Sequence, residues 1–165
     1  MKLVIYNLLI LLLIPIFQLR ILIKSYRDRG YRANFAHRYG RNFTTINRQK
    51  KKLIWFHAVS LGEVIGSQDV IRLMLKHYDV VLTTTTPTGF RKAQEIYKDS
   101  IAINYAPWDL NILIQRFIDF YQPEALLIFE TEIWPAMIST TYKKNIPIFL
   151  INARLSLKSY KAYSK

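Results

Sequence analysis

Two acidic segments each follow a run of apolar residues that is long enough for a buried strand. Glu63 comes after the run at 53–59, and Glu130 and Glu132 come after the run at 125–129. In open α/β sheets, ligands bind beyond the carboxyl ends of the strands, and a carboxylate in the turn after a strand points into that crevice. The sequence therefore predicts a catalytic face that carries Glu63, Glu130 and Glu132.

Glu63 has two alternative roles. Gly62 lets the backbone turn sharply after the strand, and Glu63 then lies near the positive end of a helix dipole, which favours a carboxylate there. An ionised, partly enclosed carboxylate can act as a general base and take a proton from an alcohol. A glutamate in the first turn of a helix is also a common cap, and the spacing alone does not decide between the two roles.

A threonine-rich segment at 83–89 precedes a predicted helix. Such a loop offers backbone N–H groups and hydroxyl groups to an anion, and helix capping would account for one of its five threonines. Arg91 in the next helical turn adds a charge that can hold a phosphate, although an exposed helix face carries basic residues as well. We therefore expect a phosphate or sugar site formed by Thr84, Thr85, Thr86, Thr88, Gly89 and Arg91.

Other positions have both a structural and a functional interpretation. Trp134 either stacks on a sugar or packs under its loop, and packing is favoured because large aromatic side chains bury area. His57 lies within a predicted strand, where a core histidine is more common than a ligand, and we expect no metal site. Arg154 and Ser156 follow the fifth predicted strand, where a guanidinium can hold a carboxylate or phosphate, or else they lie on the surface.

From residue 53 onward, short apolar runs alternate with amphipathic segments of helix length, which is typical of βαβ units and a parallel sheet. Pro87, Pro107 and Pro135 lie where strands give way to helices. The pattern predicts an α/β, Rossmann-like domain over residues 53–165. Its strands are expected near 53–59, 79–84, 101–105, 124–129 and 147–151, and its helices near 63–77, 89–98, 109–121 and 134–144.

Residues 1–23 are predicted to form a hydrophobic membrane-anchor helix. The segment 3–19 is apolar except for Asn7 and Gln18, and the apolar stretch is barely long enough to span a bilayer. No small-residue cleavage site follows it, so an uncleaved anchor is favoured over a signal peptide. The helix either crosses the membrane or lies in the headgroup layer, and its basic flank predicts that the domain is cytoplasmic.

The net charge of +13 is concentrated next to this helix. Residues 20–52 carry eleven Lys or Arg and a single acid, Asp28, whereas residues 53–165 are nearly neutral. This distribution favours an anionic membrane surface over nucleic acid as partner. Residues 24–52 are interpreted as a basic juxtamembrane segment with a short helix and a connector. Cysteine is absent, which excludes disulfides and thiolate metal ligands.

Five segments resemble, in the same order, the amino-terminal half of the 3-deoxy-D-manno-octulosonic acid (Kdo) transferases. The resemblance covers nearly the whole chain, because that family also begins with a hydrophobic anchor and a basic stretch. It implies a GT-B glycosyltransferase of lipopolysaccharide biosynthesis that moves Kdo from CMP-Kdo to a hydroxyl of the lipid A precursor, at the cytoplasmic face of the bacterial inner membrane. The segments are 57–63, 84–89, 105–109, 130–135 and 152–156.

The same resemblance implies roles for the candidate residues. Glu63 matches the glutamate taken to be the general base, and the segment with Glu130 and Glu132 supplies a second essential acid. No metal or other cofactor is implied. The residues expected to border the acceptor and the interdomain cleft are Ser60, Gly62, the threonine-rich loop with Arg91, and Arg154 with Ser156.

The sequence departs from the family pattern in length. A GT-B enzyme has two domains and binds the donor mainly on the carboxy-terminal one, whereas this sequence ends soon after the fifth predicted strand. We expect the donor domain to be missing and the 165 residues alone to hold the acceptor without transferring Kdo. The alternatives are a non-catalytic, membrane-tethered lipid A binding remnant and a polybasic nucleic-acid binder, whose affinity would fall steeply with salt.

Overall fold

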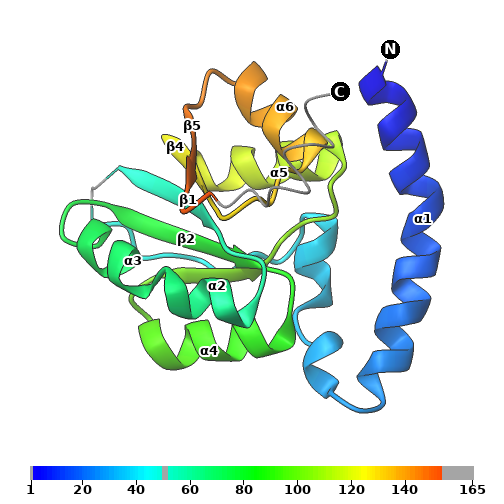
Figure 1. Ribbon diagram of the computed structural model, residues 1–165, viewed down its shortest axis with the longest axis horizontal. Coiled ribbons are helices and arrows are strands. Elements are labelled where there is room, and N and C mark those ends of the chain that lie inside the picture. Colours follow the sequence, from blue (N-terminus) through cyan, green and yellow to red (C-terminus); the bar gives the residue numbers. More distant parts are fainter. Residues whose placement is uncertain (1, 50–51, 154–165) are drawn as a thin grey trace.

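A five-stranded parallel sheet with the strand order β3-β2-β1-β4-β5 forms the centre of the protein (Figure 1). The computed structural model describes residues 2–49 and 52–153. Every residue of β1 and β2 is buried, as expected for parallel strands that are covered on both faces. The strands are β1 (Leu53–His57), β2 (Asp79–Thr84), β3 (Ala102–Tyr105), β4 (Ala125–Phe129) and β5 (Ile148–Ile151).

Helices cover both faces of this sheet (Figure 1). On one face, Phe56 and Leu82 pack in the same apolar cluster as Val64, Ile71 and Phe90, which come from the covering helices. These helices are α2 (Leu61–Gly66), α3 (Gln68–Met74) and α4 (Pro87–Tyr97).

The opposite face carries α5 (Asn111–Tyr121) and α6 (Pro135–Lys143). There Trp55 and Leu126 pack with Phe117 and Met137. The ring centroids of Trp55 and Phe117 are 4.5 Å apart. The chain therefore has the predicted α/β, Rossmann-like fold.

The predicted helix at 63–77 is divided in two at Ser67. This buried residue ends α2 and precedes α3, and its hydroxyl donates a hydrogen bond to the Val64 carbonyl at 3.2 Å. A serine that bonds the backbone behind it competes with regular helix geometry. Gly66 and Ser67 form a glycine–serine pair, which is a common site of helix breaks, so the local sequence agrees with the division.

The amino-terminal helix α1 (Lys2–Ser25) runs along one side of the domain (Figure 1). It is long and apolar enough to cross a membrane by length and composition. Near its beginning, the Tyr6 hydroxyl donates to Asp109 at 2.7 Å, and Asn7 bonds the Asn111 side chain and backbone. Further along, the Phe17 ring stacks on Trp108 with centroids 5.6 Å apart.

The predicted short helix after the anchor is instead two short 3₁₀ helices, η1 (Arg29–Tyr31) and η2 (Phe35–Tyr39). Asp28 caps η1 by accepting from the Gly30 N–H at 2.8 Å. Left-handed residues at Asn34 and Gly40 bound η2, and such turns keep the helices short. The segment continues beside the sheet, where Thr44 bonds Asn104 and the carbonyl of Ile103.

His57 lies in the core, as the sequence pattern favoured. It is fully buried, its Nδ1 is 2.8 Å from the Thr83 hydroxyl, and its Nε2 has no partner among the described residues. The Trp134 ring meets it edge-on with centroids 4.8 Å apart. Because burial penalises the charged imidazolium, the pKa of His57 falls to about 3.

We expect His57 to make the fold less stable in mild acid. Its pKa is 6.5 when unfolded and about 3 when folded, so its contribution is present above pH 6.5 and is lost as the pH falls toward 3. Between pH 7 and pH 5 the loss amounts to about 2 kcal/mol, at roughly 1.4 kcal/mol per pH unit below 6.5. Urea unfolding of the detergent-solubilised chain at several pH values measures it.

The matched variants are His57→Asn, which removes the titrating group, and His77→Asn at an exposed position. His57→Asn should reduce the pH dependence of the unfolding free energy to the part due to His37. Burial lowers the pKa of His37 as well. His77→Asn should change nothing. Equal slopes for wild type and His57→Asn would contradict a neutral core histidine.

Candidate active site

Glu63 lies in the first turn of α2, just after β1, and its carboxylate caps the helix. The Ser60 hydroxyl accepts from the Glu63 N–H at 3.3 Å, and Glu63 Oε2 accepts from the Val59 N–H at 2.7 Å. This reciprocal arrangement is a close variant of the capping box. The side chain is only 6% exposed. The capping role of Glu63 is therefore confirmed, while its role as a base stays a prediction.

Gly62 is not needed for the turn. Its φ lies outside the left-handed region, and a Cβ placed there would meet only the Ser60 hydroxyl, at 3.9 Å. The expectation that glycine permits a sharp turn here is wrong, because the backbone is helical at this point. What Gly62 does provide is exposed backbone next to the Glu63 side chain.

The threonine-rich loop bonds to the same turn through the Val59 carbonyl. This oxygen accepts from the Thr84 hydroxyl at 2.9 Å, the Thr85 hydroxyl at 3.1 Å and the Thr85 N–H at 3.0 Å. Thr86 caps α4 by accepting from the Gly89 N–H at 3.1 Å, and the Thr88 hydroxyl lies 3.4 Å from that of Thr86. The hydroxyl groups therefore join two turns, and their contact with a ligand stays a prediction.

Gly89 permits the close approach of these turns. A Cβ at this position would lie 2.7 Å from the Thr84 hydroxyl oxygen, 2.9 Å from that of Thr86 and 3.3 Å from the Ser60 carbonyl carbon. Such distances are shorter than side chains tolerate. Ser60, Thr84, Thr86 and Gly89 are thus brought together at the carboxyl edge of the sheet, while their contact with a substrate stays a prediction.

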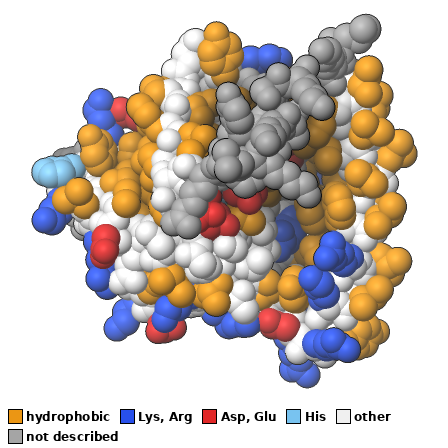
Figure 2. Space-filling view, in the orientation of Figure 1, with side chains coloured by type: hydrophobic (Ala, Val, Ile, Leu, Met, Phe, Trp, Pro, Cys, Tyr) orange, Lys and Arg blue, Asp and Glu red, His pale blue; other side chains and the backbone are white. Residues whose placement is uncertain are grey.

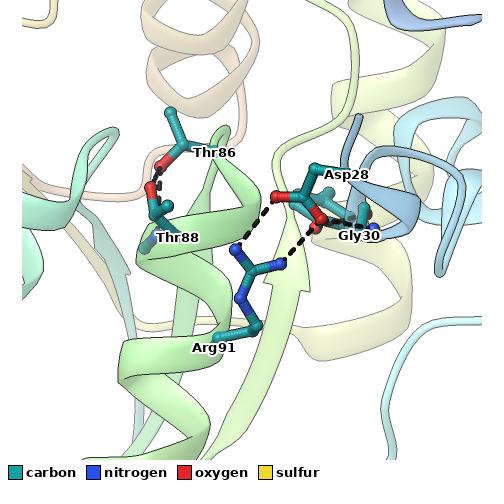
Figure 3. A network of polar contacts seen from close by, with 7 residues as sticks. Asp28, Gly30, Thr86, Thr88 and Arg91 are labelled. Carbon is teal, nitrogen blue, oxygen red and sulfur yellow. Dashed lines mark hydrogen bonds and ion pairs between the residues drawn. The ribbon is translucent and has the colours of Figure 1, made fainter. Parts of the chain in front are cut away.

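Arg91 points toward Asp28, and both guanidinium nitrogens bond that carboxylate at 2.9 Å (Figure 3). The guanidinium holds the pKa of Asp28 below its usual range, and Asp28 raises the pKa of Arg91. The sequence placed Arg91 beside a phosphate, but its planar group already has a bidentate partner. The pair instead connects α4 with the beginning of η1.

The second acidic segment follows β4, which lies next to β1 in the sheet. Glu130 has a left-handed backbone with a φ of 62°, and its N–H donates to the Ile151 carbonyl at 2.9 Å. Glu132 accepts from the Trp134 indole N–H at 3.2 Å. Trp134 is partly buried against the core, so the packing interpretation of this residue is confirmed.

Asp109 is a buried carboxylate to which sequence reasoning assigned no role. It accepts from the Met137 N–H at 2.7 Å and the Ala136 N–H at 3.0 Å, at the beginning of α6, and from the Tyr6 hydroxyl. Burial raises its pKa, and the hydrogen bonds oppose that rise. The one sequence signal was that α6 begins at Pro135 without a capping side chain nearby.

Arg38 was also missed, because it was counted as one of many charges in the basic segment. Its side chain is only 4% exposed and its Nη2 donates to the Thr85 carbonyl at 2.8 Å. The guanidinium carbon lies 4.4 Å from the centre of the Tyr105 ring. Burial lowers the pKa of Arg38 to about 10, so that it is charged at neutral pH. Nothing in the local spacing distinguishes this arginine.

The fifth predicted segment, 152–156, lies mostly outside the described residues. Arg154 and Ser156 lie outside the described residues, so their position at the sheet edge stays a prediction. Within residues 2–49 and 52–153, no group of three or more His, Cys, Asp or Glu has the arrangement of a metal site.

Comparison with known proteins shows the family to which the chain belongs. The family model of the 3-deoxy-D-manno-octulosonic-acid transferases (kdotransferases) matches residues 33–165. The 3-deoxy-D-manno-octulosonic acid transferase of Haemophilus influenzae is 36% identical over 163 residues, which are 97% of this chain and 38% of that protein. A probable mitochondrial enzyme of the same name from Arabidopsis thaliana is 33% identical over 91% of this chain and 34% of its own length.

The UDP-GlcNAc 2-epimerase of Neisseria meningitidis, solved with UDP-GlcNAc, has a TM-score of 0.48 and 20% identity over 69% of this chain and 34% of its own. The chain spans little more than a third of the length of the two transferases. The family model, by contrast, covers most of the chain, including the turns that hold Glu63, the threonines and Glu130. The chain belongs to the Kdo transferases, which are glycosyltransferases of lipopolysaccharide biosynthesis.

Proposed function

We propose that this chain is the acceptor-binding half of a GT-B Kdo transferase. The complete enzyme would move Kdo from CMP-Kdo to a hydroxyl of the lipid A precursor. The observation that carries the proposal is the position of Glu63, at the carboxyl edge of a parallel sheet in a member of this family. Ligands of such sheets bind at that edge.

In this proposal Glu63 acts as an oriented general base. The Val59 N–H holds Oε2 at 2.7 Å and thereby fixes the orientation of the carboxylate, while burial limits competition from water. The carboxylate takes the proton of the acceptor hydroxyl as that oxygen attacks the anomeric carbon of Kdo. The bond between the anomeric carbon and CMP breaks in the same step, and CMP leaves with the bonding electrons. The step as proposed uses no cofactor.

Glu130 and Glu132 would contact sugar hydroxyls from the neighbouring strand. They follow β4, which pairs with β1 over Ile54↔Ala125 to His57↔Ile128, so both acids lie at the same edge as Glu63. Carboxylates accept hydrogen bonds from hydroxyl groups and can fix a sugar in place. The donor nucleotide would bind mainly to the part of the transferases that this chain does not cover.

We propose that α1 lies in the membrane surface and does not cross it. The helix is bound to the same domain through Tyr6 and Asn7 near its beginning, through stacking of Phe17 on Trp108 past its middle, and through Lys24 over the Tyr31 ring at its end. Crossing the roughly 30 Å hydrocarbon layer would separate one of these contacts from the domain. Of residues 3–25 of the helix, only Ile14, Ile21 and Ser25 are buried.

Most of the other apolar side chains of α1 are exposed, as the row of hydrophobic side chains at the edge of Figure 2 shows. An exposed apolar face of this kind needs a partner. Lipid suits a helix whose last turns carry Arg20 and Lys24 and which is followed by Arg27. This arrangement would hold the carboxyl edge of the sheet near the cytoplasmic headgroup layer of the bacterial inner membrane. The exposed apolar residues are Val4, Ile5, Leu8, Leu9, Leu11, Leu12, Leu13, Ile16, Leu19, Leu22 and Ile23.

The base role of Glu63 can be separated from its capping role. Residues 1–165 fused to the remaining part of the Haemophilus influenzae transferase would provide a complete enzyme for a lipid transfer assay. Glu63→Gln keeps an acceptor for the Val59 N–H but cannot take a proton, so we expect near-normal stability and a transfer rate lower by about two to four orders of magnitude.

Glu63→Ala should lose both the rate and, from the lost cap, about 1 kcal/mol of stability. A wild-type transfer rate in Glu63→Gln would show that Glu63 is not the general base and that it serves only as a helix cap. If the fused wild type binds lipid but never transfers Kdo, the chain is a non-catalytic lipid A binding remnant.

Gly62→Ala tests whether the acceptor lies against the first turn of α2. A Cβ fits there without a clash, and alanine is the better helix former by roughly 0.5–1 kcal/mol, so the fold should be as stable or more stable. A methyl group in the path of the acceptor should nevertheless reduce transfer by about tenfold or more. Unchanged transfer in the fused enzyme would place the acceptor elsewhere.

The membrane arrangement of α1 can be measured with single cysteines, since the chain has none of its own. Labels at Val4, Leu12 and Ile23, all on the exposed face, should report similar shallow depths with depth-marked quenching lipids. A control label at Gln94 should not be quenched. A label at Leu12 near the bilayer centre, with the other two at opposite interfaces, would show a spanning helix.

A further inference from the structure

A cavity of about 540 Å³ lies between α1 and the loops that follow β2, β3 and β4. Its walls are largely apolar and include Ile10, Phe17 and Ile133. This volume is within the range of small-molecule sites. Because the loops after the strands form one wall, the cavity lies at the carboxyl edge of the sheet, and α1 forms the opposite wall.

One end of this cavity is cationic. A hollow of about 250 Å³ is also lined by Phe17, Arg38 and Trp108, and there Arg20 and Lys24 come from the last turns of α1. Asp109 is the one carboxylate among the described residues that line either space, and its oxygens already accept from Tyr6 and from two N–H groups of α6. The remaining charge at this end is positive.

Two hydrogen-bond donors at this end are buried and have no partner among the described residues. They are the Nε of Arg38 and the Nε1 of Trp108. Within the same part of the chain, no carboxylate pairs with Arg38, although the side chain is only 4% exposed. A buried, unpaired cation is costly, and a ligand anion would supply the missing acceptor.

We propose that this cavity binds the phosphomonoester group of a membrane lipid, with the phosphate accepting hydrogen bonds from Arg38 and Trp108. The proposal rests on the proposed function, and the lipid is then the phosphorylated acceptor. The apolar walls and α1 favour a lipid over a soluble phosphate, because acyl chains can pass along Ile10 and Phe17 into the membrane. A planar guanidinium matches a phosphate in two parallel hydrogen bonds.

The site is joined to the candidate base by a short series of hydrogen bonds. Arg38 donates to the Thr85 carbonyl, Thr85 donates to the Val59 carbonyl, and the Val59 N–H donates to Glu63. A phosphate held by Arg38 would therefore be fixed relative to the Glu63 carboxylate. In this way the cavity would orient the acceptor hydroxyl, and Arg38 and Trp108 would act as binding residues at a distance from the reacting atoms.

The test is a binding titration with the whole chain in neutral maltoside micelles. The probes are dodecyl phosphate, the lipid A precursor, the same lipid with its phosphates removed, and inorganic phosphate. Trp108→Phe removes the unpaired N–H together with part of the ring that stacks on Phe17, but leaves an aromatic ring for that stack. Affinity for both phosphorylated amphiphiles should fall about threefold to tenfold, whereas affinity for the dephosphorylated lipid should change less. Arg38→Lys keeps the positive charge but not the planar guanidinium group, and should weaken the binding of both phosphorylated amphiphiles about tenfold or more.

The control is Arg41→Gln, which removes an exposed charge from the same segment and should leave binding unchanged. The proposal is overturned if Trp108→Phe and Arg38→Lys bind dodecyl phosphate as the wild type does, or if the dephosphorylated lipid binds equally well. If inorganic phosphate binds as tightly as the phosphorylated amphiphiles, the inference that the ligand is a lipid is overturned. If the proposed function fails, dodecyl phosphate still binds with this dependence but the lipid A precursor has no advantage.

Discussion

The position of α1 depends on the buried carboxylate of Asp109. This group accepts two N–H bonds from α6, which has no capping side chain of its own, and one hydrogen bond from Tyr6 of α1. A charged-group hydrogen bond of this kind contributes more than a neutral one, about 1.5–3 kcal/mol. Because α1 also forms one wall of the cavity, the Asp109 carboxylate fixes the position of the apolar helix face relative to the cavity and to the edge of the sheet.

The backbone of Val59 has a comparable role inside the site. Its carbonyl, in one peptide group, accepts from Thr84 and Thr85, and its N–H, in the preceding peptide group, donates to Glu63, so the backbone of one residue joins the β1–α2 turn to the β2–α4 turn. Gly89 allows the second turn to approach closely enough for these bonds. The sequence pattern predicted that these threonines donate hydrogen bonds to an anion. In the structure, Thr84 and Thr85 donate to the Val59 carbonyl instead, and so help to form the surface on which a ligand would lie.

The fold could be predicted because its signals are local. Buried parallel strands give continuous apolar runs, and β2 was predicted at 79–84, where the structure has it. The site could be predicted only in part. The contacts of Arg38 with Thr85 and of Arg91 with Asp28 join residues that are 47 and 63 positions apart, and periodicity carries no information about such pairs. The break at Ser67, by contrast, has a local signal in the glycine–serine pair at Gly66 and Ser67.

The basic segment acts in two different physical ways. Arg27, Arg29 and Arg32 are exposed, so their attraction to an anionic membrane acts through water and is screened by salt over about 10 Å. Arg38 is buried, and its interaction with a ligand is screened far less. Added salt should therefore weaken attachment to anionic vesicles much more than the preference of the cavity for a phosphorylated lipid. In the proposed arrangement, the charge that brings the domain to the membrane would thus be distinct from the charge that selects the lipid.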